Sequence, residues 1–198
     1  MSNVSKVEII NKGLVLVGAA PIVNIDDDSN NAKVAQRTYG LSLRSVLAEC
    51  KWNFATKRAM LSLLTDNVAW YEPGEGYVYQ KPLDMVRIFS TNSPKAVWRE
   101  EGDYIISDTP GLGVRYTWFI ETPGKYSAEF IDALVDKFAS DVAYTLVNSL
   151  TLGEKYKALY EKVTKPKAMS VNSQTGTQQT PIDDAWDLSR FSDQHPEA

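Results

Sequence analysis

A short acidic stretch offers the first candidate for metal chemistry. The spacing Asp26-x-Asp28-x-Asn30 matches the first three oxygen ligands of a calcium-binding loop. Such a loop also needs glycine at its sixth position and glutamate at its twelfth, where this sequence has Asn31 and Arg37. We therefore expect Asp28, Ser29 or Asn30 to cap the helix that follows, with the acids near its dipole, and we expect no metal site.

Paired carboxylates suggest a second chemistry, glycoside hydrolysis. Glu100, Glu101 and Asp103 stand close together in the sequence, but they fall in a predicted exposed turn. Nothing there would raise the pKa of one carboxyl group above that of another, so we expect solvated charges.

The Gly-x-Gly pair at 111–113 precedes a predicted strand, whereas a phosphate-binding loop precedes a helix, so a turn is expected.

Nucleophilic catalysis has few possible residues. His195 is the only histidine and Cys50 the only cysteine. These counts argue against His-dependent triads, multi-His metal sites and an intramolecular disulfide. No serine or cysteine stands in a nucleophile-elbow context. We expect no catalytic residue and no cofactor, and therefore not an enzyme.

The net charge of −4 is confined to one end of the chain. Residues 174–198 contain five acids and one base, whereas residues 1–173 are balanced. A balanced body argues against a protein that coats nucleic acid, so the basic residues Lys51, Lys57 and Arg58 are expected to be a solvated face. The longest apolar run, 13–20, is far shorter than the ~20 residues that span a membrane.

Two helices are predicted at the N-terminal end. The first covers 5–19, where Ser5 and Glu8 have capping-box spacing and Gly18 and Pro21 end the pattern. The second covers about 31–51 and is followed by Trp52 and Phe54, whose aromatic rings at an element junction we expect in the core. Together the helices contribute the predicted core residues Leu14, Val17, Tyr39, Leu43 and Val46.

Strand-forming residues dominate the middle of the chain. Candidate strands are 68–71, 76–80, 85–90, 96–100, 104–107 and 114–120, with a tight turn at 101–102 between the fourth and fifth. A helix over about 127–150 then supplies Phe138, Val142 and Leu146 to the core. We expect a break at 151–153, a last helix ending at about Lys165 before Pro166, and a polar linker over 170–179.

The order of these elements predicts an α+β fold. We expect an antiparallel helix bundle, built from two N-terminal and two C-terminal helices, with an inserted antiparallel β-domain and an extended C-terminal tail. The predicted boundaries are 1–56 and 124–168 for the bundle, 57–123 for the β-domain, and 169–198 for a flexible linker and docking tail.

The C-terminal segment carries spaced apolar residues among its acids. They are Ile182, Trp186, Leu188 and Phe191. A free tail gains nothing in water from such side chains, whereas a docking peptide gains by burying them, since large aromatics dominate interface energetics. We interpret this segment as a docking arm.

Several motifs in one order resemble a known family. They are LVLVGAAPI at 14–22, WNFA at 52–55, YVYQKPLD at 77–84, VRI at 86–88 and WREEG at 98–102. The set resembles the head-to-tail adaptors of short-tailed phages, the tail tubular protein A family, over about residues 5–165. Proteins of that family have a helix bundle carrying an inserted β-domain.

The resemblance implies a structural role in a virion. It implies a ring, most often a dodecamer, that docks below the portal protein, receives the tail nozzle protein, and lets the genomic DNA pass through its channel without sequence-specific binding. The location implied is the portal–nozzle junction of the virion tail, after assembly in the host cytoplasm and with no membrane partner. Two alternatives stay open: a glycan-degrading tail hydrolase, and a DNA-packaging or completion factor.

Overall fold

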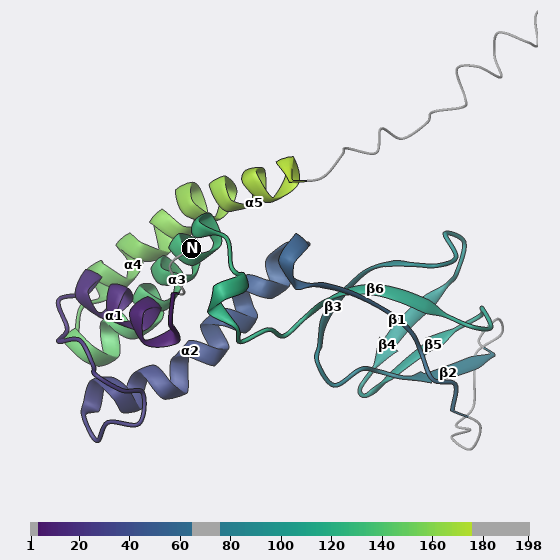
Figure 1. Cartoon of the computed structure of the whole chain (residues 1–198), viewed down its shortest axis with the longest axis horizontal. Coiled ribbons are helices and arrows are strands. Elements are labelled where there is room, and N and C mark those ends of the chain that lie inside the picture. Colours follow the sequence, from purple (N-terminus) through teal and green to yellow (C-terminus); the bar gives the residue numbers. More distant parts are fainter. Residues whose placement is uncertain (1–3, 65–75, 176–198) are drawn as a thin grey trace, which may run out of the picture.

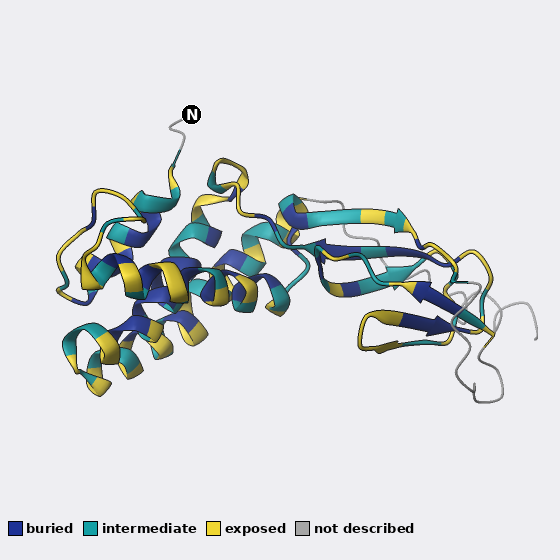
Figure 2. Ribbon diagram, turned by 90° about the horizontal axis from the view of Figure 1, so that it is seen from below, coloured by how far each residue is buried: buried dark blue, intermediate teal, exposed yellow. Residues whose placement is uncertain are grey.

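A computed structural model describes residues 4–64 and 76–175 of the chain. The protein is mixed α+β and elongated, with the helices gathered at one end and the strands at the other (Figure 1). Buried residues run through the interior of both ends, and exposed residues cover their surfaces (Figure 2). No helix in the described part of the chain is long and apolar enough to cross a membrane.

The first two helices begin at side-chain caps. In α1 (Lys6–Leu16), the Ser5 hydroxyl accepts from the amide of Glu8 and the Glu8 carboxylate accepts from the amide of Ser5, which completes the predicted capping box. In α2 (Asn30–Glu49), Ser29 is the N-cap and accepts from the amide of Ala32. A one-turn 3-10 helix, η1 (Asn53–Ala55), then leads into the strands.

The strands form two three-stranded antiparallel sheets. One sheet has the order β1 (Thr56–Met60), β6 (Gly113–Trp118), β3 (Met85–Thr91). The other has the order β2 (Tyr77–Gln80), β5 (Tyr104–Ser107), β4 (Trp98–Glu101). The predicted turn between β4 and β5 is present, and Gly102 adopts φ +57° there, a conformation that favours glycine.

No pattern in the sequence predicts β1. Its residues, TKRAM, alternate poorly between polar and apolar, and the first predicted strand, 68–71, lies outside the described residues. β1 is a strand because it pairs with β6, from Thr56 opposite Thr117 to Met60 opposite Gly113, and not because of its local sequence. The chain therefore enters and leaves the strand region on neighbouring, hydrogen-bonded strands.

The C-terminal helices begin and end at other residues than predicted. The break after α3 (Ala128–Val147) comes at Asn148, which adopts the left-handed conformation with φ 51°, and not at 151–153. α4 (Leu150–Leu159) starts at the cap Ser149 and contains Gly153, where an added Cβ would lie 3.4 Å from the Ser140 carbonyl oxygen of α3, an ordinary contact.

The last helix runs past the predicted stop at Pro166. A π-helical turn, η3 (Tyr160–Thr164), precedes α5 (Lys165–Gln174), so Pro166 falls in a first turn, where its missing amide hydrogen is tolerated. The prediction of a flexible linker from residue 169 is therefore wrong for 169–174, which are helical. Three hydrogen bonds hold α5 near η1: the Asn53 amide to the Asn172 side chain (2.8 Å), Asn53 Nδ2 to the Asn172 carbonyl (2.7 Å), and Asn172 Nδ2 to the Lys51 carbonyl (2.7 Å).

The helices pack around α3, which contacts α1, α2, α4 and α5. A first hydrophobic cluster fills this helical end, and a second lies between the two sheets. Trp118, at the end of β6, packs against both clusters. A single indole therefore connects the interior of the helical end with that of the strand end.

Candidate functional site

The residues predicted to form the helical core lie together. Leu14, Val17, Tyr39, Leu43, Val46, Phe138 and Val142 are buried in the first cluster, and Leu146 is half-buried against it. The Trp52 indole is fully buried, donates to the Val46 carbonyl at 2.9 Å, and meets the Phe130 ring edge-on with centroids 4.9 Å apart. Trp52 is therefore a core residue, as expected.

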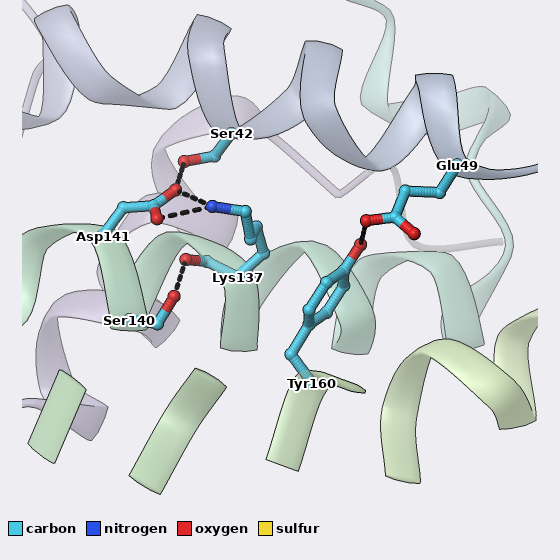
Figure 3. A network of polar contacts seen from close by, with 6 residues as sticks. All are labelled: Ser42, Glu49, Lys137, Ser140, Asp141 and Tyr160. Carbon is cyan, nitrogen blue, oxygen red and sulfur yellow. Dashed lines mark hydrogen bonds and ion pairs between the residues drawn. The ribbon is translucent and has the colours of Figure 1, made fainter. Parts of the chain in front are cut away.

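A hydrogen bond between side chains joins α2 to α3 (Figure 3). The Asp141 carboxylate accepts from the Ser42 hydroxyl at 2.6 Å and pairs with Lys137 one turn away on α3. Ser42 itself is 1% exposed. Because a buried hydroxyl needs a partner, this charge-assisted bond fixes the register of the two helices.

A second contact joins α2 to the C-terminal helices (Figure 3). The Tyr160 hydroxyl donates to Glu49 at 3.3 Å. Lys165 pairs with the other oxygen of the same carboxylate at 2.8 Å. Burial raises the pKa of Tyr160, and the Glu49 carboxylate raises it further. The phenol therefore stays protonated and acts as a hydrogen-bond donor, a structural role.

The junction between helices and strands contains a set of polar contacts centred on Lys57 and Asp84. The Lys57 ammonium lies 3.7 Å from the Trp118 ring centroid and 2.5 Å from the Asp84 carboxylate, which also accepts from the Tyr116 hydroxyl at 3.1 Å. Burial raises the pKa of Asp84, but the bonds from Lys57 and Tyr116 outweigh it and hold that pKa below its usual value.

The same junction also raises the pKa of the Tyr116 hydroxyl. Burial, together with the neighbouring Asp84, raises the pKa of Tyr116 to about 12. A further bond crosses from the strands to the helices, where Arg87 donates to the carbonyl of Ala48 at 3.1 Å. Sequence reasoning assigned Lys57 to a solvated face, and only knowledge of the β1–β6 pairing could have placed it over Trp118.

A surface groove lies on the sheet formed by β1, β6 and β3. It has a volume of about 480 Å³. Residues of all three strands, and Asn92 just after β3, line it: Arg58, Ala59, Met60, Ser90, Thr91, Asn92, Gly113, Val114 and Arg115. Arg58 stands directly opposite Arg115. No sequence motif marks this pair, because its members are 57 positions apart and meet only through strand pairing.

The acidic loop before α2 has a structural role. Asp27 accepts from the amides of Val23 and Asn24, and Asp28 pairs with Lys33. Within the described residues, no three His, Cys, Asp or Glu side chains gather so that they could hold a metal ion. The cap of α2 is Ser29, one of the three residues that the sequence suggested.

Two of the three candidate carboxylates of the β4–β5 hairpin each pair with a basic residue. Glu100 binds Lys81 at 2.6 Å and Glu101 binds Arg99 at 2.6 Å. The Gly-x-Gly pair forms a turn, in which Gly111 has φ +65°, and leads into β6. Neither feature resembles a hydrolytic cleft or a phosphate-binding loop.

The predicted docking residues Ile182, Trp186, Leu188 and Phe191 lie outside the described residues. The described part of the chain therefore presents two features for functional interpretation: the polar junction at Lys57 and the arginine groove. A scan against protein-family models found no match, and a search of curated proteins found no significant match.

Proposed function

We propose that the chain is a structural virion protein, the subunit of a head-to-tail adaptor ring in a short-tailed phage. The ring joins the portal to the tail nozzle, forms part of the channel for DNA ejection, and has no catalytic residue. The proposal rests on the resemblance of the ordered motifs over 5–165 to the tail tubular protein A family.

One structural observation supports the proposal above the others. Helices α1 and α2 precede the strands and α3 to α5 follow them, and the first and last strands of the insertion pair directly, from Thr56 opposite Thr117. An insertion that leaves and rejoins a helical body at one point is the arrangement expected for the adaptor family. In this proposal the helices form an antiparallel bundle that carries the β-domain.

The polar contacts within the helical end suit a subunit that must keep its shape. Ser42 and Asp141 fix α2 on α3, while Glu49 fixes α2 on the C-terminal helices. Small differences in subunit shape add up around a ring and prevent it from closing. Helices held in fixed positions relative to one another therefore favour closure of the ring.

The C-terminal segment supplies the docking arm in this proposal. Ile182, Trp186, Leu188 and Phe191 pack against the portal or a neighbouring subunit, and the acids between them face basic groups or solvent. Each arm contributes modest affinity, and the ring multiplies it, since linked weak sites act together once the portal templates them.

Mass measurement tests the proposal directly. Analytical ultracentrifugation of the purified chain should show a monomer or small species, and addition of assembled portal should yield a closed ring, most simply a dodecamer. A stable monomer in the presence of assembled portal would contradict the adaptor function.

The two alternatives make different predictions from the same preparation. A glycan hydrolase would degrade polysaccharide as pure protein, whereas Glu100 and Glu101 each have a basic partner. A packaging factor would retain duplex DNA in a salt-dependent way. The adaptor predicts neither activity.

A further inference from the structure

The arginine pair lies on the outer face of its sheet. Residues directly opposite in an antiparallel pair point to the same face, so the side chains of Arg58 and Arg115 are neighbours. The alternate residues Ala59, Val114 and Tyr116 face the cluster between the two sheets. The arginines therefore point away from the core and into the groove.

Neither arginine is neutralised within residues 4–64 and 76–175. No ion pair or hydrogen bond involves either guanidinium, and Arg115 Nε is fully buried without a partner. Like charges directly opposite each other destabilise a sheet. A buried donor without an acceptor adds a further cost. An anion in the groove would remove both costs.

The groove walls indicate which anion fits. A guanidinium fork binds a carboxylate through two parallel hydrogen bonds. Beside the arginines lies Met60, which is 66% exposed and stands opposite Gly113. The apolar Met60 side chain lies next to two cations. Such a surface binds a ligand in which carboxylates alternate with apolar side chains. A phosphate backbone would use the cations but leave the apolar wall uncovered.

We propose that this groove binds the chain's own acidic C-terminal segment, residues 182–191. The segment places Asp183, Asp184 and Asp187 among Ile182, Trp186, Leu188 and Phe191, which is the pattern that the groove requires. The inference deepens the proposed function, on which it rests for the docking role of this segment, and it names the receiving surface on the subunit.

The end of α5 puts the segment within reach. Thr175 accepts from Asn53 Nδ2 at 2.6 Å, and Arg58 follows Asn53 by only five residues. An extended chain spans about 3.3–3.6 Å per residue, so Thr175 and Arg58 are separated by at most roughly 25 Å, allowing for the side-chain link. Asp183 follows Thr175 by eight residues, which extend to about 26 Å. The same copy can therefore fill its own groove, and a neighbouring copy can replace it in a ring.

Fluorine NMR of the full chain labelled with 5-fluorotryptophan tests the inference. The chain has five tryptophans, and a Trp186→Phe variant assigns the Trp186 signal. We expect this signal in the wild type to be shifted from its position in the urea-unfolded chain. Arg58→Glu and Arg115→Glu should each move it most of the way to that position. An Asp184→Arg exchange added to Arg58→Glu should recover the wild-type shift.

The control is Arg37→Glu, which reverses an exposed charge on α2 and should leave the Trp186 signal unchanged. A signal independent of protein concentration identifies binding within one copy, and a signal that shifts on dilution identifies exchange between copies. A Trp186 signal that ignores both groove substitutions overturns the inference. The inference is also overturned if the protein retains duplex DNA through Arg58 and the Trp186 signal does not change. The measurement contains no portal, so its failure and a failure of ring assembly on the portal are separate results.

Discussion

The Phe138 ring of α3 lies against the backbone of α1 at Gly13. A Cβ atom placed on Gly13 would come within 2.5 Å of Phe138 Cδ1, closer than real Cβ contacts. Phe138 is fully buried and also meets the Tyr39 ring edge-on at 6.3 Å between centroids. Glycine at position 13 is thus required by the packing of two helices, and φ there is that of an ordinary helix.

The substitution Gly13→Ala should therefore destabilise the protein. Alanine improves helix propensity by about 1 kcal/mol, but overpacking against a fixed ring typically costs about 1–3 kcal/mol, so the net change should be a loss. Gly40→Ala is the matched control, since Gly40 is also helical and its Cβ would meet nothing within 4 Å. Urea unfolding should show a lower midpoint for the first variant and a higher one for the second. Equal stabilisation by both would contradict the contact.

Truncation of Phe138 itself tests its place in the core. Phe138→Ala should lower the free energy of unfolding by about 3–5 kcal/mol, through lost burial and the cavity left behind. Tyr144→Ala on the same helix removes a ring that is 58% exposed and should change stability by less than about 1 kcal/mol. An unchanged denaturation midpoint in a folded Phe138→Ala protein would show that the ring is not packed as described.

The helical elements were largely predictable because their signals are local. The capping box at Ser5 and the spacing of Leu14, Tyr39 and Phe138 each depend on residues within a turn or two, and these residues are where the periodicity put them. β1 was missed because its residues acquire order only from β6, distant in sequence. The Arg58–Arg115 groove was missed for the same reason.

The C-terminal helix was misjudged for a different reason. Residues 170–174 are polar except for Val171 and lack an apolar stripe, so composition favoured a linker. Asn172 donates to the Lys51 carbonyl and accepts from the Asn53 amide, and these bonds replace the missing apolar contacts. Ala168 is buried just before them. Specific polar partners far away in sequence leave no periodic pattern that a single sequence reveals.

Removal of the Asn172 side chain should loosen α5. Asn172→Ala deletes the bonds to the Asn53 amide and the Lys51 carbonyl, each worth about 0.5–1.5 kcal/mol. Hydrogen exchange should become faster over 165–174, while the exchange of α3 stays slow. Ser173→Ala removes a bond within the same helix, to the Met169 carbonyl, and serves as the control. Unaltered exchange in Asn172→Ala would mean that α5 is held by other contacts.

Asp136 should make stability depend on pH. The side chain is 5% exposed, and burial raises its pKa above the ordinary value of 3.8. A raised folded-state pKa means that the folded protein binds the proton more tightly than the unfolded chain does. Stability should therefore fall as the pH rises from about 3.8 through the folded-state pKa.

The substitution Asp136→Asn should remove that fall. The variant should gain stability relative to the wild type as the pH rises toward neutrality, measured by urea unfolding across the acidic range. Glu154→Gln, which removes an exposed carboxylate on α4 that is not among the groups shifting the pKa of Asp136, should show no such gain. Parallel pH profiles for wild type and Asp136→Asn would mean that Asp136 pays no burial penalty.

Deletion of residues 180–198 should separate folding from attachment. The elements from α1 to α5 end at Gln174, so the truncated chain should keep the circular dichroism of the full chain. Attachment to assembled portal should weaken, because a buried tryptophan anchor is typically worth at least ~2 kcal/mol per copy and a ring multiplies that loss. Trp186→Ala should reproduce most of the defect, whereas Ser192→Ala, in the same segment, should not. A pull-down in which the truncated chain binds portal as well as the full chain does would show that the segment is a solvated tail.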